Sequence, residues 1–555
     1  MTTQAPATAA IFHHPDVVES ADKPLAGRRT AGQSFLAGYT RHMVGDRLSV
    51  AAATQAHLDH FCDLAKANGW RGKVDRMLTS NTTGLGRAGV LMLPGPTVGK
   101  YAWVRRRGGQ RLYSICGITH TVSTRRIMEG LLDSAVAPVE EWDAIICTSR
   151  AVQQVIATEL DEAETYLRRR FAAGRVPRPQ LPVIPLGIDT AAFARDGAAR
   201  AHWRKTHGIG ENDLAVMSMG RLSVFEKMHP APLYIALQRA AEETGATLHL
   251  MMVGWFANDS AEALHRDAAA ALAPSVTVHF PDGKDEALRY QIWSAADIFA
   301  LPVDNIQETF GLAPVEAMAA GLPVVCSDWN GFRDTVDHGV TGFRVRTLMS
   351  RPGYGQRIAA RFEDNADGYH QYLGFVHQRT TVDVPEMAEA FAALIRDPGK
   401  RAAMGAAGRT RARQLYDWAA VIPQYQALWA DLNARRDRGL PTSGREQEDA
   451  ANPAAMDPFT LYRGYPTGVL PVTALLSAER TVTEAEIDQL ITLTGGKAIH
   501  RIVAKAPHIA DLLALIHAQG QIRLDAVQDA TELDPATAEG VVLWLAKYDL
   551  IRVEM

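Results

Sequence analysis

The chain has 555 residues, of which 47% are hydrophobic and 22% are charged. This composition is typical of a folded globular protein with about three or four domains, so a single small module and a wholly disordered chain are excluded. Because 58 Lys and Arg residues face 62 Asp and Glu residues, the net charge is −4 and no global basic field attracts nucleic acid.

The cysteines and the N-terminus indicate the compartment. Cys62, Cys116, Cys147 and Cys326 are far apart and have no metal-ligand spacing, so we expect neither a structural zinc site nor a disulfide framework. The first residues lack the basic stretch and apolar core of a signal peptide, and no window approaches about 18 uninterrupted apolar residues. We therefore expect a cytoplasmic protein without an integral membrane segment.

Residues 1–185 alternate apolar runs with amphipathic stretches, which predicts an α/β domain with a mainly parallel sheet. The runs AAIFHHPDVV, RLSVAAAT, GVLMLPGP, RLYSICGIT and WDAIICTS are expected to be strands. A ligand site then belongs at the carboxyl ends of these strands. The stretch that follows, VPRPQLPVIPLG, contains four prolines and is expected to connect two domains.

Residues 186–415 repeat the pattern, with expected strands DLAVMSMGRL, TLHLMMVGW, SVTVHFPDG, DIFALPV and LPVVCSD. The sequence therefore predicts two Rossmann-like domains that face a central cleft, where ligands commonly bind. Residues 416–436 have apolar positions at helical spacing and are expected to form a long helix that closes the first domain.

The remaining residues predict an appended module. Residues 437–465 are rich in charged and turn residues, which is typical of a linker, and residues 466–555 predict a small, mainly helical, winged-helix-like domain. Residues 498–555 carry five Lys or Arg against eight Asp or Glu, a balance that disfavours DNA binding. We expect a dimerisation or docking module, and hence a possible homodimer.

The densest motif is ALPVDNIQETFGLAPVEAMAAGLPVVCS at residues 300–327. Glu308 and Glu316 are separated by seven residues and lie around the start of an expected helix near Leu312. Such a helix start offers backbone N–H groups and a positive dipole end to a phosphate or a sugar hydroxyl. Gly311 permits close backbone approach, and Glu316 can accept hydrogen bonds from vicinal hydroxyls such as those of ribose.

This stretch resembles the signature of the family-four retaining glycosyltransferases of the GT-B fold. In that signature seven residues separate two glutamates, and the second glutamate begins an EAMA-G-PVV run. The resemblance implies that Glu308 lies beside the transferred sugar and that Glu316 holds the ribose of a nucleotide. It also implies that Thr309, Phe310 and Gly311 offer backbone amides to the sugar and the diphosphate.

Two further motifs agree with this resemblance. Arg221 and Lys227 in MGRLSVFEKMHP are cations suited to a diphosphate, although Lys227 lies one residue further on than in the commonest family pattern. His120 in GITHT follows an expected strand and matches the position at which the family places a histidine facing the donor sugar. We predict that His120, Arg221, Lys227 and Glu308 are the catalytic set.

The other donor-side candidates rest on weaker patterns. The stretch GRRTAGQSFLAGYTRH is expected to be a turn after the first strand. Gly32 and Gln33 are its candidates for contacts with the diphosphate or the acceptor, and the alternative is a plain strand-to-helix turn without a ligand role. This stretch lacks the paired glycines that the family often carries there. Pro281, in VHFPDGK, resembles the region of the family that contacts the nucleotide base.

A departure from the family pattern lies at about residues 346–381, where a long insertion follows TGFRV. Long irregular loops in compact domains are usually binding elements or disordered. Arg351, Tyr354 and Arg357 are candidates for acceptor or lid contacts, and a surface decoration is the alternative.

The sequence thus predicts an enzyme that moves a sugar, as the family implies with retention of configuration, from a UDP- or GDP-sugar to an acceptor that the sequence does not identify. No Asp-x-Asp triplet is present, so we expect no metal and no further cofactor. The alternative is a non-catalytic sugar-nucleotide-binding scaffold that recruits partners through its C-terminal module. A dinucleotide-dependent oxidoreductase is disfavoured, because TSNTTGLGRAGV contains only a partial glycine fingerprint.

Overall fold

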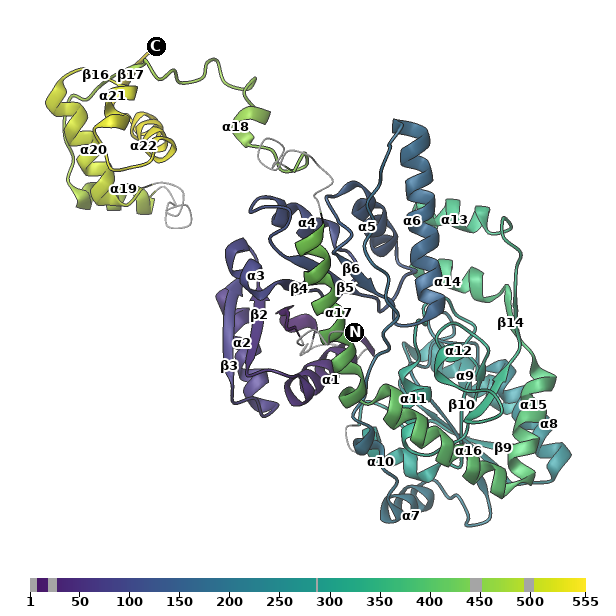
Figure 1. The fold of residues 1–555 in the computed structure, drawn as a ribbon. Coiled ribbons are helices and arrows are strands. Elements are labelled where there is room, and N and C mark those ends of the chain that lie inside the picture. Colours follow the sequence, from purple (N-terminus) through teal and green to yellow (C-terminus); the bar gives the residue numbers. More distant parts are fainter. Residues whose placement is uncertain (1–6, 18–26, 286–287, 440–451, 494–503) are drawn as a thin grey trace. The chain divides into compact units, whose positions relative to one another are not determined.

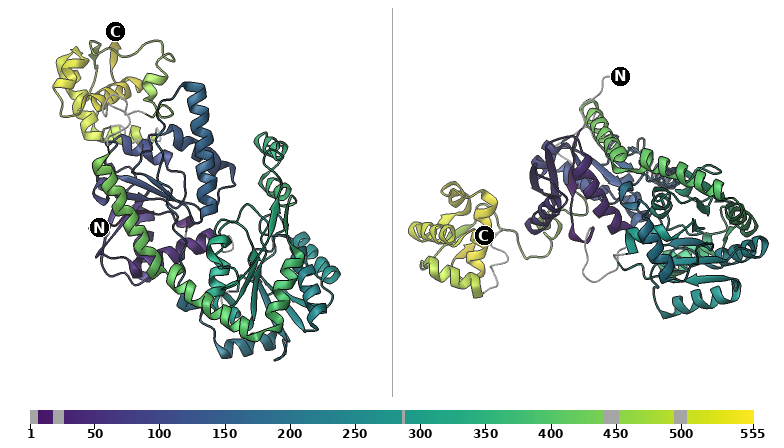
Figure 2. Two further views of the ribbon diagram at one scale, coloured as in Figure 1. Left: turned by 45° about the vertical axis from the view of Figure 1, so that its right-hand side comes forward. Right: turned by 90° about the horizontal axis from the view of Figure 1, so that it is seen from below.

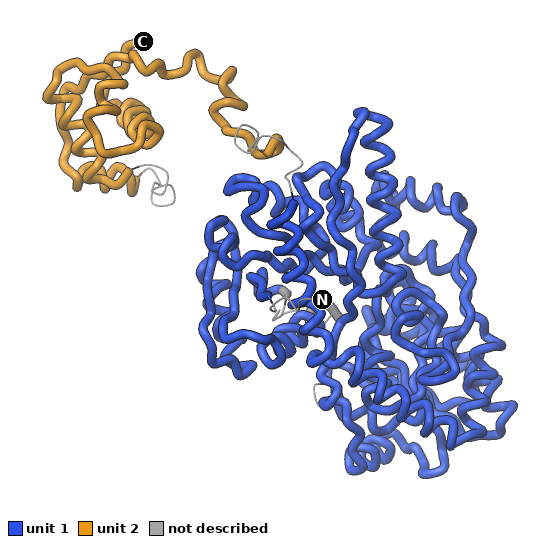
Figure 3. The backbone as a smooth tube through the Cα atoms, viewed as in Figure 1, with its two compact units in different colours: residues 1–451 blue, residues 452–555 orange. Residues whose placement is uncertain are grey.

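The computed structural model describes residues 7–17, 27–285, 288–439, 452–493 and 504–555. The chain divides into two compact units, residues 1–451 and 452–555, which Figure 3 colours separately. The larger unit contains two lobes, each built on its own parallel sheet (Figure 1).

The first lobe is a six-stranded parallel sheet in the order β3-β2-β1-β4-β5-β6. Its strands are β1 Ala10–Phe12, β2 Arg47–Ala52, β3 Lys73–Leu78, β4 Val90–Met92, β5 Ser114–Ile118 and β6 Ala144–Ile146. Its helices are α1 Gly27–His42, α2 Gln55–Ala67, α3 Thr82–Ala88, α4 Gly99–Arg106, α5 Arg125–Val136 and α6 Arg150–Phe171. Every residue of β5 is buried, as expected for a strand whose sheet has helices on both faces.

One buried ion pair ties the inner strands of this lobe together. Arg105 and Asp143 have fully buried side chains, with Arg105 Nη1 2.5 Å from Asp143 Oδ1. Asp143 also accepts the N–H of Ile115 at 2.8 Å, and Arg105 donates to the carbonyl of Tyr113 at 3.1 Å. Loss of one partner of a buried ion pair is strongly destabilising, because it leaves the other charge buried and unpaired.

The second lobe repeats the architecture, in the order β12-β11-β10-β7-β8-β9. Its sheet consists of β7 Leu214–Met219, β8 Leu248–Val253, β9 Val276–His279, β10 Ile298–Leu301, β11 Val324–Ser327 and β12 Gly342–Val345. Its helices are α7 Gly197–Thr206, α8 Ala231–Thr244, α9 Asp259–Leu272, α10 Leu288–Gln291, α11 Leu312–Ala319, α12 Phe332–Thr335, α15 Val384–Arg396 and α16 Pro398–Arg411, with the 3-10 turns η2 Thr190–Phe193 and η3 Ile292–Ala295.

Both sheets have the strand order of a doubly wound Rossmann fold, with the first and fourth strands adjacent at the centre. The chain reverses direction across the sheet between β1 and β4 and between β7 and β10. In open α/β sheets, ligands bind outside the carboxyl ends of the strands at this switch point. The predicted pair of Rossmann-like domains is confirmed, and the fold places the ligand site at the loops after these central strands.

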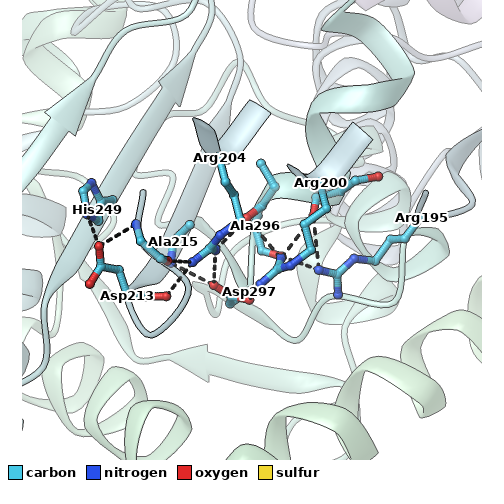
Figure 4. Close-up of polar contacts among 11 residues, drawn as sticks. Arg195, Arg200, Arg204, Asp213, Ala215, His249, Ala296 and Asp297 are labelled. Atoms are coloured by element: carbon cyan, nitrogen blue, oxygen red, sulfur yellow. Dashed lines mark hydrogen bonds and ion pairs between the residues drawn. The ribbon is translucent and has the colours of Figure 1, made fainter. Parts of the chain in front are cut away.

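Arginines at the start of the second lobe fasten α7 to the segment before β10, as Figure 4 shows. Arg200 and Arg204 donate to the two carboxylate oxygens of Asp297 at 2.8 and 3.1 Å, and Arg195 donates to the carbonyl of Ala296 at 2.8 Å. Asp297 also accepts the N–H of Ala215 in β7 at 2.9 Å. These contacts hold β7 and β10, the two strands whose ends carry the site, in fixed register.

The inserted segment is an excursion with its own secondary structure. It consists of β13 Thr347–Met349, α13 Gln356–Glu363, α14 Tyr369–His377 and β14 Thr380–Val382. The strands β13 and β14 pair antiparallel, with Thr347 opposite Val382, so the insertion leaves and rejoins the second lobe at one place.

The chain then returns to the first lobe. After η4 Ala412–Tyr416, a π-helical turn, α17 Trp418–Arg438 packs against α1, β4 and β5, and Figure 2 shows it lying along the first lobe. The side chains of Trp429 and Tyr425 are fully buried there. Arg436 donates to the carbonyl of Gly89 at 2.6 Å and so fastens the end of α17.

The smaller unit has its own hydrophobic core. Its elements are α18 Pro458–Leu461, β15 Leu475–Ser477, α19 Glu484–Leu493, α20 Ala506–Gln519, β16 Ile522–Arg523, α21 Leu524–Asp529, α22 Pro535–Lys547 and β17 Arg552–Glu554. The strands form an antiparallel sheet in the order β16-β15-β17. Asp534 caps α22 by accepting the N–H of Thr537 at 3.1 Å. A helical module is confirmed, and its winged-helix character stays a prediction.

Candidate active site

A cavity of about 450 Å³ lies between the two lobes of the larger unit. The first lobe contributes the segment around His120, the helix residue Ala31 and the connecting residue Leu186. The second lobe contributes the loops after β7, β8 and β9, the segment after β10 and the start of α11. Its lining includes Gly220, Arg221, Glu226, Lys227, Gly254, Trp255, Gly283, Arg289, Gln307, Glu308, Thr309, Phe310, Gly311 and Glu316.

The loop after β7 brings both predicted cations to the cavity. Gly220 has a φ of +152°, a backbone conformation that residues with a Cβ rarely adopt, and this turn directs Arg221 out of the strand. The guanidinium of Arg221 pairs with Glu226 and donates to Gln307 Oε1 at 2.5 Å. Lys227 Nζ lies 2.6 Å from Glu308 Oε2. Sequence positions eighty residues apart therefore meet in one charged cluster.

The carboxyl of Glu308 is held in its ionised form. Burial alone would raise the pKa of Glu308, but the Lys227 ammonium and the backbone N–H groups of Thr309 and Phe310 outweigh it and hold the pKa below its ordinary value. The Thr309 N–H lies 3.2 Å from Glu308 Oε1. This amide, predicted to serve a sugar or diphosphate, therefore contacts the Glu308 carboxylate.

Glu316 has the opposite electrostatic character. Burial raises its pKa from 4.5 to about 7, against smaller opposing effects of Arg289 and Lys227. Glu316 lies in the second turn of α11, whose N-cap Gly311 has a φ of +92°. The first-turn N–H groups of a helix have no intrahelical partner, and residues 311–313 line the cavity. The cavity thus combines a helix start with cationic side chains, among them Arg221 and Lys227, and with carboxyl groups, among them Glu308 and Glu316.

His120 is the predicted site residue contributed by the first lobe. Its backbone carbonyl accepts a hydrogen bond from Thr309 Oγ1 at 3.0 Å. The hydroxyl of Ser149, in the same lobe, donates to the carbonyl of Thr309 at 2.8 Å. The second lobe is therefore fastened to the first directly beside Glu308, and His120 lines the cavity that carries the charged cluster.

Several predicted site residues lie elsewhere. The stretch GRRTAGQSFLAGYTRH is helix α1 and not a turn, because Phe35, Leu36 and Tyr39 recur at helical spacing and pack inward. Gly32 lines an apolar cavity of about 70 Å³ that shares His120 with the main cavity, and Gln33 lines another of about 390 Å³ that shares Glu316 with it. Among the α1 residues whose side chains the structure describes, Ala31 lines the main cavity.

Pro281 and the three insertion candidates do not line the main cavity either. The carbonyl of Pro281 accepts the N–H of Gly254 at 3.1 Å, so Pro281 supports the loop after β8 from behind. Arg351, Tyr354 and Arg357 are exposed, and the Arg351 guanidinium lies over the Tyr354 ring, 4.9 Å from its centroid.

Sequence reasoning missed several lining residues, among them Glu226, Gln307, Trp255 and Arg289. Glu226 lies between Arg221 and Lys227, and Gln307 directly precedes Glu308, so proximity to the motifs could have indicated both. Trp255 follows β8 at the carboxyl edge of the sheet, where ligands bind, and this position was a usable signal. Arg289 in α10 lies far from every motif, and only the fold reveals it.

The described residues contain neither a metal-binding cluster nor a membrane-spanning helix. Within the described ranges, no group of three or more His, Cys, Asp or Glu side chains is arranged to hold a metal ion. Among the helices that the structure describes, none has the length and apolar character needed to cross a membrane.

Comparisons with known proteins agree with this geometry. Residues 199–349 match the family model for glycosyl transferases group 1. The chain is 26% identical over 432 residues to the GDP-mannose-dependent alpha-(1-6)-phosphatidylinositol monomannoside mannosyltransferase of Mycobacterium tuberculosis, covering 70% of this chain and 92% of that protein. It is also 26% identical over 319 residues to the GDP-mannose:cellobiosyl-diphosphopolyprenol alpha-mannosyltransferase of Komagataeibacter xylinus, covering 58% of this chain and 64% of that protein.

A solved structure supports the same fold. The glycosyltransferase from Rickettsia africae superposes with a TM-score of 0.51 at 10% identity, over 77% of this chain and 98% of that one. The two parallel sheets and the family match together support the class of a group 1 glycosyltransferase of the GT-B fold. The enzyme class supported by the relatives is a nucleotide-sugar-dependent glycosyltransferase.

Proposed function

We propose that this protein transfers a sugar from a nucleotide diphosphate sugar to an acceptor hydroxyl, with retention of configuration and without a metal ion. The observation that carries the proposal is that Arg221, Lys227 and the start of α11 line the same cavity as Glu308 and Glu316. We propose GDP-mannose as the donor, because it is the donor in the names of two of the relatives, the Mycobacterium tuberculosis and Komagataeibacter xylinus mannosyltransferases.

The charges of the cavity suit a departing diphosphate. When the bond between the anomeric carbon and the phosphate oxygen breaks, negative charge grows on that oxygen. Arg221, Lys227 and the α11 start stabilise this charge without further reorganisation. The acceptor oxygen bonds to the anomeric carbon from the same face, and its proton passes to the departing phosphate oxygen. This geometry gives retention.

The two carboxyl groups have separate tasks in this proposal. Glu308 is ionised and paired with Lys227, so it places negative charge beside the sugar as positive charge grows at the anomeric carbon. Glu316, whose pKa is raised to about 7, accepts hydrogen bonds from the ribose hydroxyls when ionised. Different environments give two glutamates on one short segment different chemistry.

A ligand screen tests the proposal. A nucleotide sugar at about 100 times its dissociation constant stabilises the protein by about 2.7 kcal/mol, which a thermal shift detects. We expect GDP-mannose or another nucleotide sugar to stabilise the protein, and Arg221→Ala to remove the shift. The matched control Arg239→Ala removes an exposed arginine of α8 in the same lobe and should keep it.

Two outcomes would contradict the proposal. If no nucleotide sugar stabilises the protein, the cavity is not a donor site. If a donor binds but is neither hydrolysed nor transferred in the presence of EDTA and added acceptors, the protein is a sugar-nucleotide-binding scaffold or an enzyme that depends on a metal. Re-addition of Mg²⁺ or Mn²⁺ then separates these two alternatives, because it restores turnover only in the metal-dependent enzyme.

For the smaller unit we retain dimerisation or docking as the proposal. Support comes from its separate core and from the segment at residues 453–469, which is exposed throughout and includes Phe459 and Tyr465, each 84% exposed. Exposed aromatic clusters often mark protein interfaces. Light scattering of the full chain should give twice the monomer mass if the unit dimerises. A monomer mass would exclude dimerisation and leave docking to another protein as the proposed role.

A further inference from the structure

The insertion contacts the first lobe, although it belongs to the second lobe in sequence. Tyr369, in the first turn of α14, has its hydroxyl 2.8 Å from Ser123 Oγ. Arg125 Nη1 donates to the carbonyl of Glu363 at 3.0 Å, and its guanidinium lies 4.8 Å from the Phe362 ring centroid. The insertion is therefore a bridge between the lobes, a short distance along the chain from His120.

Helix α14 also contacts Gln307 and Glu226, the two side chains that bind Arg221. Gln307 accepts from Arg221 through Oε1 at 2.5 Å and donates through Nε2 to the Tyr369 hydroxyl at 3.3 Å. Glu226 pairs with Arg221 through one carboxylate oxygen, and its other oxygen lies 2.9 Å from His370 Nδ1. Two consecutive residues of α14 thus each contact one partner of the same guanidinium.

The direction of this hydrogen-bond chain follows from the donors. A guanidinium only donates, so the oxygen of the Gln307 amide must face Arg221 and its NH₂ must face Tyr369. The Tyr369 oxygen then accepts, and its own proton is available for Ser123 Oγ. Ser123 Oγ in turn shares a hydrogen bond with Thr121 Oγ1, 3.3 Å away, and Thr121 lines the cavity.

We propose that Tyr369 and His370 are positioning residues of the insertion that fix the aim of Arg221 into the donor cavity and couple it to the first-lobe segment after His120. The proposal rests on the proposed function, because it takes Arg221 as a cation for the donor diphosphate. Without the Tyr369 hydroxyl, the Gln307 NH₂ loses its acceptor. The amide is then free to turn its N–H groups toward the guanidinium, which cannot accept them.

Kinetics of Tyr369→Phe test the proposal. A neutral hydrogen bond contributes about 3- to 10-fold in an equilibrium or rate, and we expect kcat/KM for the donor to fall by this factor with the melting temperature unchanged. The matched control Tyr372→Phe removes a hydroxyl from the same helix, where the Tyr372 ring stacks on Phe362, and should leave kcat/KM unchanged. An equal fall in both variants would overturn the proposal.

A double-mutant cycle separates positioning from a merely structural role. A lysine at position 221 carries all its N–H donors on one nitrogen and lacks the planar fork with which Arg221 holds Gln307 and Glu226 through two different nitrogens. If Tyr369 acts through Arg221, Tyr369→Phe should cost far less in the Arg221→Lys background than in the wild type. Equal losses in the two backgrounds would show that Tyr369 does not act through Arg221.

A ligand-free measurement keeps this inference distinct from the proposed function. In hydrogen exchange without nucleotide, Tyr369→Phe should speed exchange in residues 119–124 and 304–309, and Tyr372→Phe should not. Unchanged exchange would refute the bridge even if the protein binds nucleotide sugars. Faster exchange in a protein that binds no nucleotide sugar would leave the bridge standing and overturn only the proposed function.

Discussion

Replacing Glu316 with glutamine should stabilise the protein and weaken donor binding. Burial raises the pKa of Glu316 from 4.5 to about 7, so above pH 7 the folded state carries a carboxylate that it disfavours. That difference corresponds to about 3 kcal/mol of folding free energy. Because the side chain keeps partial access to the cavity, we expect Glu316→Gln to recover about 2 kcal/mol at pH 8.5.

The direction in which the stability of the folded protein changes with pH identifies the buried Glu316 carboxyl as the cause. The folded pKa is the higher one, so the folded state binds more protons between pH 4.5 and 7, and the wild type loses stability as pH rises through this window. The gain of Glu316→Gln over wild type should therefore shrink below about 1 kcal/mol near pH 5. Thermal melting at the two pH values measures this difference.

Donor binding should respond in the opposite direction. In the wild type, affinity for a nucleotide sugar should increase as pH rises through about 7, because the ionised carboxyl of Glu316 is the better acceptor for ribose hydroxyls. Glu316→Gln should bind about tenfold more weakly at pH 8.5 and lack this pH response. The exposed Glu389→Gln on α15 is the control for loss of one charge. A gain in stability that is equal at both pH values would refute the electrostatic reasoning.

Three further substitutions test the helix start at Gly311, the cation at Lys227 and the buried ion pair of Arg105. Gly311→Ala should abolish donor binding in a thermal-shift assay, because a Cβ at this positive φ would overlap the Phe332 ring. Lys227→Met should lower turnover about 100-fold, since it removes a cation from the departing diphosphate, and the acid limb of the pH–rate profile should move to higher pH as the Glu308 pKa rises. Arg105→Met should cost about 3–5 kcal/mol in urea unfolding, because it leaves a buried aspartate unpaired.

The central strands of both sheets and the edge strands β6 and β9 were predictable, whereas the edge strands β3 and β12 were not. Strands such as β5 and β10 are short apolar runs that are buried throughout, and the sequence pattern found them. The strands β3 and β12 lie at sheet edges, where KVDRML and GFRV mix charged and apolar residues because part of each strand is exposed. The short pair β13 and β14 was missed for a similar reason, since β13 is largely exposed.

The site was predictable where local sequence determines it. Glu308, Glu316 and Gly311 occupy one strand–loop–helix segment, so their spacing alone indicated a ligand site. The pairing of Lys227 with Glu308 joins two loops of the folded sheet, and no local pattern could show it. The segment around Gly32 is a helix because its apolar residues recur at helical spacing and face the core. The prediction gave more weight to the glycines of this segment than to that spacing, and so it expected a turn.

The most direct test of the central claim is the anomeric form of the sugar that the protein releases. We would incubate wild-type protein with GDP-mannose in EDTA and follow the first minutes by proton NMR, with water as the acceptor if no other is known. We expect GDP to appear together with mannose of the donor's own anomeric configuration, and we expect Arg221→Ala to abolish the release of both. Release of the opposite anomer, or undiminished release by Arg221→Ala, would contradict the claim.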